Sequence, residues 1–341
     1  MGKLRSEFFF GFGGEMWVFP EVLGKSVAFE REGVGVSIDL PPFDQKQLES
    51  GDFRERKWCS GVVGAPGAWK AVGLSLFRVT LREDVAGLSK EERESGRKSS
   101  GDAAQYLGSR LCVAQGVAVE FLDWLRANGL VHLGVIGQAP RQFAANRVFD
   151  ESAAYEFPAS FGGTIKLAVR SSGDLDAKLF NEIAFELHAG RRPAMPESLL
   201  ADAFFFLAGG LDSDLKRAVL FAAIACETKV AETLRTRAKP ECRLLVDELL
   251  GNPRDFSVRA AGLFHTFMRA AVGVSLRDDN RDLHDTIELL FKIRNRVAHK
   301  GEEVPRSEVR RLLEGARAAM SWLDGVHVAD GGQKPSGSEA L

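Results

Sequence analysis

The chain has 341 residues, of which 45% are hydrophobic and 27% charged, and its 45 Lys and Arg residues nearly balance its 47 Asp and Glu residues. This composition is typical of a globular protein with about two domains, and it excludes fibres and small disulfide scaffolds. The net charge of -2 excludes a basic field over the whole protein, so any nucleic-acid surface must be local.

Cysteine spacing and hydropathy limit the classes of site further. The four cysteines, Cys59, Cys112, Cys226 and Cys242, form no CxxC or Cys/His ligand spacing. We therefore expect no metal, no cofactor and no disulfide framework, as in a reducing compartment. No apolar run approaches the roughly 18 residues of a membrane helix, so the sequence predicts a cytoplasmic protein without a membrane partner.

Residues 1–175 are predicted to form a β-rich domain with one or two helices, because short β-branched and aromatic stretches recur between glycines and prolines. Apolar residues at every fourth position predict a helix over residues 113–125, before Asn128 and Gly129. No motif attaches chemistry to this domain, and we expect it to sense a ligand or partner. The expected strands are residues 26–30 and 33–40, which pair as a hairpin, and residues 71–81, 130–136 and 164–169.

After residue 175 the apolar period changes from two to three or four, which indicates helices. We expect a connecting helix or linker over residues 176–195, a helical bundle over residues 196–327 and a disordered tail over residues 328–341. The predicted fold class is α+β, a β-rich N-terminal domain followed by an all-α bundle. The bundle helices are expected at residues 199–208, 214–238, 241–250, 257–272, 281–297 and 308–323.

One amphipathic helix carries an arginine where its periodicity predicts a core residue. The missing member of the apolar series falls on Arg294. A buried guanidinium without a partner is costly, so Arg294 must be paired or face a cleft. The apolar positions that define the series are Leu283, Ile287, Leu290, Phe291, Val297 and Ala298.

His299 follows Arg294 by five residues, near the predicted end of this helix. In an unbroken helix the two side chains point about 140° apart, so they converge only if the last turn loosens or a second chain contributes. This is the one Arg-x4-His pair in the sequence. Residues 292–311 contain seven basic and three acidic side chains, which gives a nearly neutral protein one locally basic segment.

Residues 294–299, RNRVAH, resemble the Arg-[polar]-x3-His signature of HEPN domains, the α-helical domains of prokaryotic toxins, abortive-infection proteins and other defence ribonucleases. The resemblance covers about residues 196–325. The order of the two regions, with a β-rich region before the bundle, is most similar to the ApeA-like branch of bacterial anti-phage proteins.

The resemblance implies a metal-independent endoribonuclease that acts as a homodimer through its C-terminal helices, with Arg294 and His299 of both copies lining one cleft. Imidazole can transfer protons near neutral pH, and guanidinium can stabilise a charged phosphorane. RNA, with tRNA as one candidate, is the implied substrate, and an inhibitor partner or a phage-derived trigger remains open.

Further residues take roles from the same resemblance. Asn295 occupies the polar position, and it shares a helix face with His299, which it could orient. Glu227 is our candidate for an acidic residue from an earlier helix, with Glu232 as its rival. The expected RNA-binding cations are Lys292, Arg296 and Lys300.

A non-catalytic interpretation also fits these residues. Arg294 could form a structural ion pair with Glu227 or Asp285, and His299 could interact with the helix dipole. The bundle would then be a HEPN-like dimerisation or binding module beside a β-rich domain that senses a ligand or partner.

Overall fold

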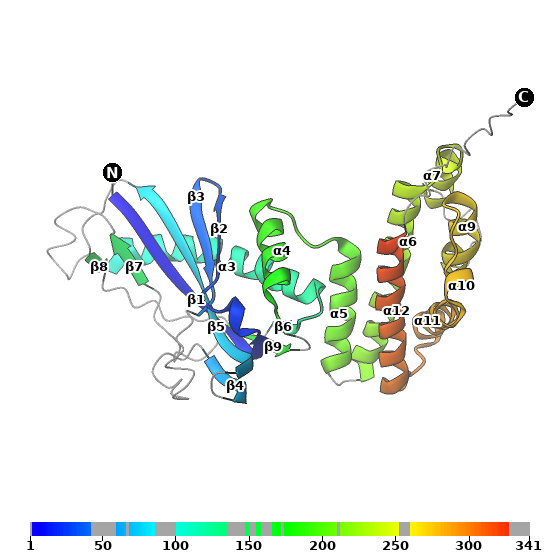
Figure 1. Ribbon diagram of the computed structural model, residues 1–341, viewed down its shortest axis with the longest axis horizontal. Helices are drawn as coiled ribbons and strands as arrows, with labels where there is room; N and C mark the ends of the chain where they lie inside the picture. Colours follow the sequence, from blue (N-terminus) through cyan, green and yellow to red (C-terminus); the bar gives the residue numbers. More distant parts are fainter. Residues whose placement is uncertain are drawn as a thin grey trace, which may run out of the picture. The chain divides into compact units, whose positions relative to one another are not determined.

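In the computed structural model the chain divides into two compact units, Met1–Pro193 and Ala194–Leu341. The first contains a β-sheet and the second is helical, so the predicted α+β class is confirmed (Figure 1). The predicted tail at residues 328–341 lies outside the described residues. The structure describes residues 2–41, 59–65, 68–85, 100–135, 147–150, 155–157, 166–171, 174–209, 212–251 and 260–326.

The first unit is built on one sheet with the strand order β2-β3-β5-β1-β7-β8. Beyond this path β4 pairs with β5, and β9 pairs with both β1 and β6. The predicted hairpin is present as β2 and β3, which are in register from Ser26↔Asp39 to Arg31↔Val34. The described strands are β1 (Gly2–Val18), β2 (Ser26–Arg31), β3 (Val34–Asp39), β4 (Cys59–Ala65), β5 (Ala68–Val85), β6 (Val131–Val135), β7 (Arg147–Asp150), β8 (Tyr155–Phe157) and β9 (Lys166–Ser171).

Strand β1 organises this sheet. It runs antiparallel to β5 from Gly2↔Val85 to Val18↔Val72, with an irregularity between Gly11 and Met16. It also pairs antiparallel with β7 and parallel with β9. Its length therefore lets β1 pair with three other strands of the first unit.

Helix α3 (Ser100–Ala127) packs on β1 and β5, and it begins well before the predicted residue 113. The Phe121 ring meets the Phe77 ring edge-on, with centroids 5.3 Å apart. Helix α4 (Ala177–His188) buries Phe180 and Leu187 in the same core. Residues 177–188, predicted as a connection, thus belong to the first unit, because their apolar face completes its core.

A polar cluster on β1, β2, β3 and β5, here the Asp39 cluster, consists of Glu7, Ser26, Asp39, Arg78 and Thr80. Asp39 accepts hydrogen bonds from Ser26 Oγ at 2.6 Å, Thr80 Oγ1 at 2.8 Å and Arg78 Nε at 3.0 Å. Arg78 Nη1 also lies 3.3 Å from Glu7 Oε1. Burial alone would raise the pKa of Asp39, but these donors hold it below its ordinary value.

The second unit is a helical bundle around one apolar core. None of the helices in the described residues combines the length and apolarity needed to cross a bilayer. The elements are α5 (Met195–Gly209), α6 (Asp212–Arg237), η2 (Pro240–Cys242), α7 (Arg243–Gly251), α8 (Ala260–Gly262), η3 (Leu263–Phe267), α9 (Met268–Ala271), α10 (Leu276–Asp279), α11 (Arg281–Lys300) and α12 (Arg306–Gly325).

Helix α6 is the central element of the bundle, and its predicted apolar stripe is buried. The buried thiol of Cys226 lies on this stripe, and burial raises its pKa to about 12, so it is a packing residue rather than a nucleophile. Lys229 Nζ joins α6 to α5 and α12 through Glu197 at 2.6 Å and Asp324 at 2.7 Å. The stripe consists of Leu215, Val219, Ala222, Ala223, Cys226, Val230 and Leu234.

Two details of the bundle differ from a set of regular helices. The predicted helix 257–272 is broken, because residues 263–267 form the π-helical turn η3 between α8 and α9. Helices α11 and α12 approach closely at Gly315, where an added Cβ would lie 2.5 Å from Thr286 Cγ2. A side chain larger than that of glycine at this crossing would therefore force Thr286 to shift.

Candidate functional site

Helix α11 has well-defined ends, which fix the position of its side chains. Asn280 accepts a hydrogen bond from the Leu283 amide at 3.0 Å, which satisfies one free donor of the first turn. Gly301 ends the helix in the left-handed region, with φ 64°. The helix therefore ends at Lys300 and not at the predicted residue 297. The residues of the candidate motif all lie on one continuous helix.

The buried face of α11 corrects one premise of the sequence analysis. Ile293 is 1% exposed and fills the core position at this turn, whereas the Arg294 side chain is 33% exposed. Ala298, also assigned to the core, is exposed. The reason is that the stripe advances by three residues from Leu290 to Ile293 and then by four to Val297, which places Arg294 at the edge of the core.

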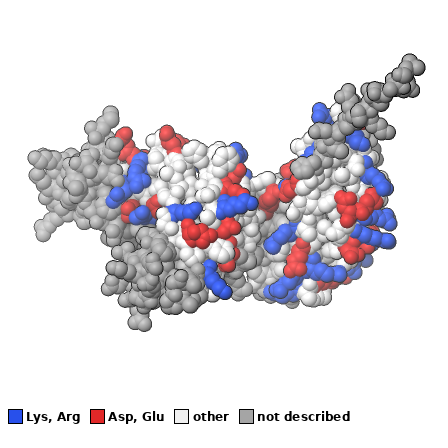
Figure 2. Space-filling view, viewed as in Figure 1, with Lys and Arg blue, Asp and Glu red and all other residues white. Residues whose placement is uncertain are grey.

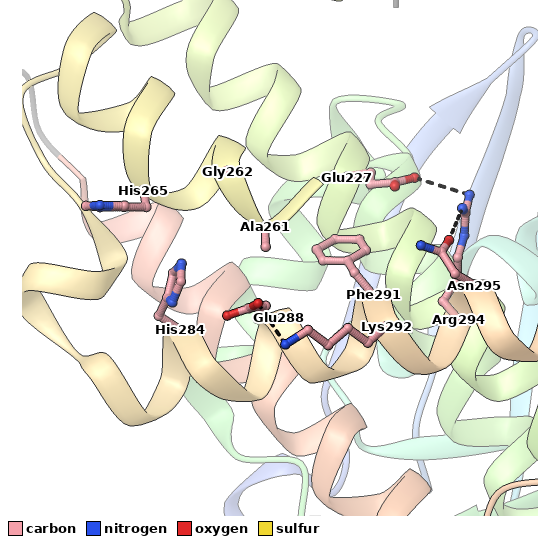
Figure 3. Close-up of a pocket in the computed structure, with 10 residues that line it drawn as sticks. All are labelled: Glu227, Ala261, Gly262, His265, His284, Glu288, Phe291, Lys292, Arg294 and Asn295. Atoms are coloured by element: carbon pink, nitrogen blue, oxygen red, sulfur yellow. Dashed lines mark hydrogen bonds and ion pairs between the residues drawn. The ribbon is translucent and has the colours of Figure 1, made fainter. Parts of the chain in front are cut away.

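Arg294 nevertheless faces a cleft, which is one of the two alternatives expected for this guanidinium. A pocket of about 660 Å³, here the α11 pocket, opens between α11, α8, η3 and α6. This volume lies within the range of about 300–1,000 Å³ typical of small-molecule sites. Figure 3 shows the lining residues, which are Glu227, Ala261, Gly262, His265, His284, Glu288, Phe291, Lys292, Arg294 and Asn295.

Three of the predicted site residues meet at one end of the α11 pocket. Arg294 Nη1 donates a hydrogen bond to Asn295 Oδ1 at 3.0 Å, and Arg294 Nη2 lies 3.9 Å from Glu227 Oε2 (Figure 3). The second distance is too long for a hydrogen bond, so the ion pair is loose. Asp285, the other suggested partner of Arg294, instead lies near His284.

The environment of Glu227 suits proton transfer better than that of Glu232. Burial raises the pKa of the Glu227 carboxyl, and the charge of Arg294 offsets only part of this rise. A carboxyl with a raised pKa is a common feature of functional sites. Glu232 is half-buried and is not among the residues that line the α11 pocket.

His299 is exposed near the end of α11 and does not line the α11 pocket. Since α11 stays helical through Lys300, the five-residue spacing keeps His299 about 140° from Arg294 around the helix axis. One chain therefore does not bring the two predicted catalytic side chains together.

The predicted RNA-binding cations differ in their partners. Lys292 Nζ lies 2.8 Å from Glu288 and Arg296 Nη1 lies 3.1 Å from Glu302. Lys300 is exposed at the end of the helix. On the face of the helical unit drawn in Figure 2, basic and acidic side chains alternate. Any attraction for RNA there would arise from local groups, as the net charge requires.

Sequence reasoning missed two histidines of the α11 pocket, His265 and His284. Their rings meet edge-on with centroids 5.8 Å apart, and His265 Nδ1 shares a 2.7 Å hydrogen bond with Ser275 Oγ. His265 lies in the π-helical turn, so a period of 3.6 does not predict its direction. A usable signal was the four-residue spacing of His284 and Glu288, which places both on one face of α11.

Comparison with protein-family models, curated proteins and solved structures gives no match to this chain. A guanidinium held by one amide, a carboxyl with a raised pKa and two imidazoles around an open pocket can bind an anion and move protons.

Proposed function

We propose that the helical unit is a metal-independent endoribonuclease that acts as a homodimer, in an anti-phage (abortive infection) or toxin-like role in the cytoplasm. The observation that carries the proposal is the state of Arg294, a half-buried guanidinium at the edge of a pocket, whose contacts among the described residues are a hydrogen bond to Asn295 and a loose ion pair with Glu227. Such a group keeps donors available for a phosphate, which it can bind in a bidentate manner. The similarity of residues 294–299 to the HEPN signature adds the imidazole of His299.

The reaction would be attack of a ribose 2'-oxygen on the adjacent phosphorus. His299 of one copy accepts the 2'-hydroxyl proton, and the same histidine of the second copy donates a proton to the departing 5'-oxygen. Arg294 stabilises the charge that develops on the phosphorane. The products are a 2',3'-cyclic phosphate and a 5'-hydroxyl, so atoms and protons balance without a metal.

Two copies are needed for a geometric reason. Arg294 and His299 point about 140° apart on one helix, and one imidazole cannot readily serve as both acid and base. A twofold axis beside α11 would supply a second imidazole. Exposure of His299 and of residues around it leaves this end of α11 accessible to a second copy.

The test uses the purified full chain with tRNA and total RNA in excess EDTA. We expect cleavage that leaves 2',3'-cyclic phosphate ends and that is lost in both Arg294→Ala and His299→Ala. The matched controls are Arg277→Ala and His188→Ala, which change exposed residues away from the α11 pocket. Cleavage that disappears with EDTA, or that survives in both site variants, would refute the mechanism.

The Glu227–Arg294 contact favours a second candidate, a binding module in which this pair is structural. The bundle would then hold a partner or dimerise while the β-rich unit senses a ligand. This candidate predicts that His299→Ala leaves the cellular phenotype unchanged and that light scattering still finds a dimer. The first proposal predicts loss of the phenotype in the same variant.

A further inference from the structure

Three side chains on α11 form a group that the proposed ribonuclease does not use. His284, Asp285 and Glu288 each offer one ligand atom, and these atoms all lie within 4.8 Å of one another. His284 and Glu288 line the α11 pocket, side by side in Figure 3. We propose that this group is a binding site for one divalent first-row transition-metal ion such as Zn²⁺.

The buried imidazole is the observation that points to a ligand. His284 is 7% exposed, and its Nδ1 is enclosed without a hydrogen-bond partner among the described residues. Asp285 Oδ1 lies 3.6 Å from this nitrogen, too far for a hydrogen bond. A buried polar atom without a partner is costly, and a bound cation would supply the missing interaction.

The chemistry of the group selects the class of ion. One imidazole nitrogen with two carboxylates suits Zn²⁺, Mn²⁺ or Fe²⁺, whereas Mg²⁺ and Ca²⁺ prefer oxygen ligands alone. Three protein ligands leave coordination positions open toward the α11 pocket, as in sites that also bind an external molecule. Both carboxylates can adjust, because the Asp285 side chain is 59% exposed and that of Glu288 is 38% exposed.

The distances require a small rearrangement. Two ligand atoms on one tetrahedral Zn²⁺ lie about 3.4 Å apart. Asp285 Oδ1, at 3.6 Å from His284 Nδ1, is already near this separation, and a pair at the 4.8 Å limit of the group must close by about 1.4 Å. The orientation of the His284 ring is fixed, since it packs edge-on against His265, which is itself hydrogen-bonded to Ser275. The packed imidazole would therefore position the ion, and the more exposed carboxylates would complete the site.

Lys292 competes with the ion. Its ammonium lies 2.8 Å from Glu288 Oε1 and neutralises one ligand of the group (Figure 3). A metal ion on this oxygen would displace the ammonium, which can move into solvent because the Lys292 side chain is 63% exposed. Removing the lysine charge should therefore tighten metal binding, an effect that a merely structural role of Glu288 would not produce.

The test is titration of the full, EDTA-treated chain with Zn²⁺ alone in a calorimeter, and with Co²⁺ as an optical probe. We expect one ion per chain, Co²⁺ absorption without a thiolate band, and affinity reduced about 10-fold or more by the combined Asp285→Asn and Glu288→Gln changes. Lys292→Met should raise the affinity severalfold. Both carboxylate changes are at accessible side chains, so the variant should fold even if His284→Ala does not.

Asp282→Asn, an exposed carboxylate on the same helix outside the group, is the matched control and should leave Zn²⁺ binding unchanged. Binding that persists in the double carboxylate variant, a thiolate band with Co²⁺, or no gain in Lys292→Met would each overturn the proposal. Because the titration contains no RNA and the cleavage assay contains EDTA, either proposal can fail without the other.

Discussion

The Asp39 cluster of the first unit and the α11 pocket of the second differ in how closely their charged side chains are paired. In the Asp39 cluster each carboxylate has close donors, with Asp39 hydrogen-bonded at 2.6 Å by Ser26 and at 3.0 Å by Arg78. In the α11 pocket the Arg294–Glu227 distance is 3.9 Å, and His284 Nδ1 has no hydrogen-bond partner among the described residues. Satisfied charges stabilise a fold, while loosely paired ones remain available to a ligand.

The largest expected effect separates activity from stability. Arg294→Ala should lower RNA cleavage about 100–1,000-fold, because it removes stabilisation of the transition state, with little change in melting temperature. Arg78→Ala, the matched change in the Asp39 cluster, should lower the melting temperature and leave cleavage per folded molecule intact. Cleavage rates and thermal melts of both variants measure the two effects. A lower melting temperature in Arg294→Ala together with lost cleavage in Arg78→Ala would contradict the contrast between the two sites.

The next effect tests whether the Asp39 cluster stabilises the sheet. Asp39→Asn should reduce the free energy of unfolding at pH 7 by about 2 kcal/mol, because it weakens hydrogen bonds to a charged acceptor. The folded state lowers the pKa of Asp39, so this stability is present above about pH 4 and is lost as the pH falls through the folded pKa. Urea unfolding of both proteins from pH 7 to pH 3 should show their difference shrinking. A difference that stays constant would argue against an electrostatic origin.

A packing change in the helical unit should have a similar or smaller effect. Gly315→Ala places a methyl group 2.5 Å from Thr286 Cγ2. Thr286 resists a shift because its Oγ1 donates a hydrogen bond to the Asp282 carbonyl at 2.9 Å. We expect a net loss of about 1–2 kcal/mol in unfolding free energy. Gly116→Ala in α3, where nothing lies within 4 Å, should instead gain about 0.5–1 kcal/mol. Denaturant melts compare the two, and equal effects would mean that α11 and α12 are not tightly packed.

The smallest effect concerns Glu227. Its pKa is raised in the folded state, so folding favours the protonated carboxyl, and this contribution declines as the pH rises through the folded pKa. Glu227→Gln should therefore match the wild type near pH 4 and exceed its stability by roughly a few tenths of a kcal/mol at pH 8, since the group is partly exposed. Thermal melts of both proteins from pH 4 to pH 8 show which of the two is more stable at each pH. A variant that is less stable at pH 8 would show that the Arg294 pair outweighs burial.

Local patterns predicted most elements of both units. The hairpin of β2 and β3, the buried stripe of α6 and the start of α11 at Arg281 follow from alternation, period and capping within short windows. Residues 177–188 were predicted as a helix but assigned to a connection. Their place in the first unit depends on Phe180 packing on a sheet formed far earlier in the chain.

The candidate site was predictable only in part. Arg294, Asn295 and Glu227 do meet in the α11 pocket, but the core position assigned to Arg294 belongs to Ile293. A one-residue difference in helix register is finer than an apolar series can resolve, because both positions lie near the same face. His265 and His284 could not be paired from sequence, since a π-helical turn and the packing of α11 bring them together.

The long strand β1 also constrains how the chain is made. Its phenylalanine-rich segment at residues 8–10 pairs with β5, which ends at Val85, and the neighbouring residues pair with β9, which ends at Ser171. During translation these apolar side chains leave the ribosome long before their partners exist, whereas each helix of the bundle can form from local contacts as it emerges. Until β5 and β9 have emerged, β1 is therefore an unpaired apolar strand, which is the kind of segment that makes a nascent chain prone to aggregate.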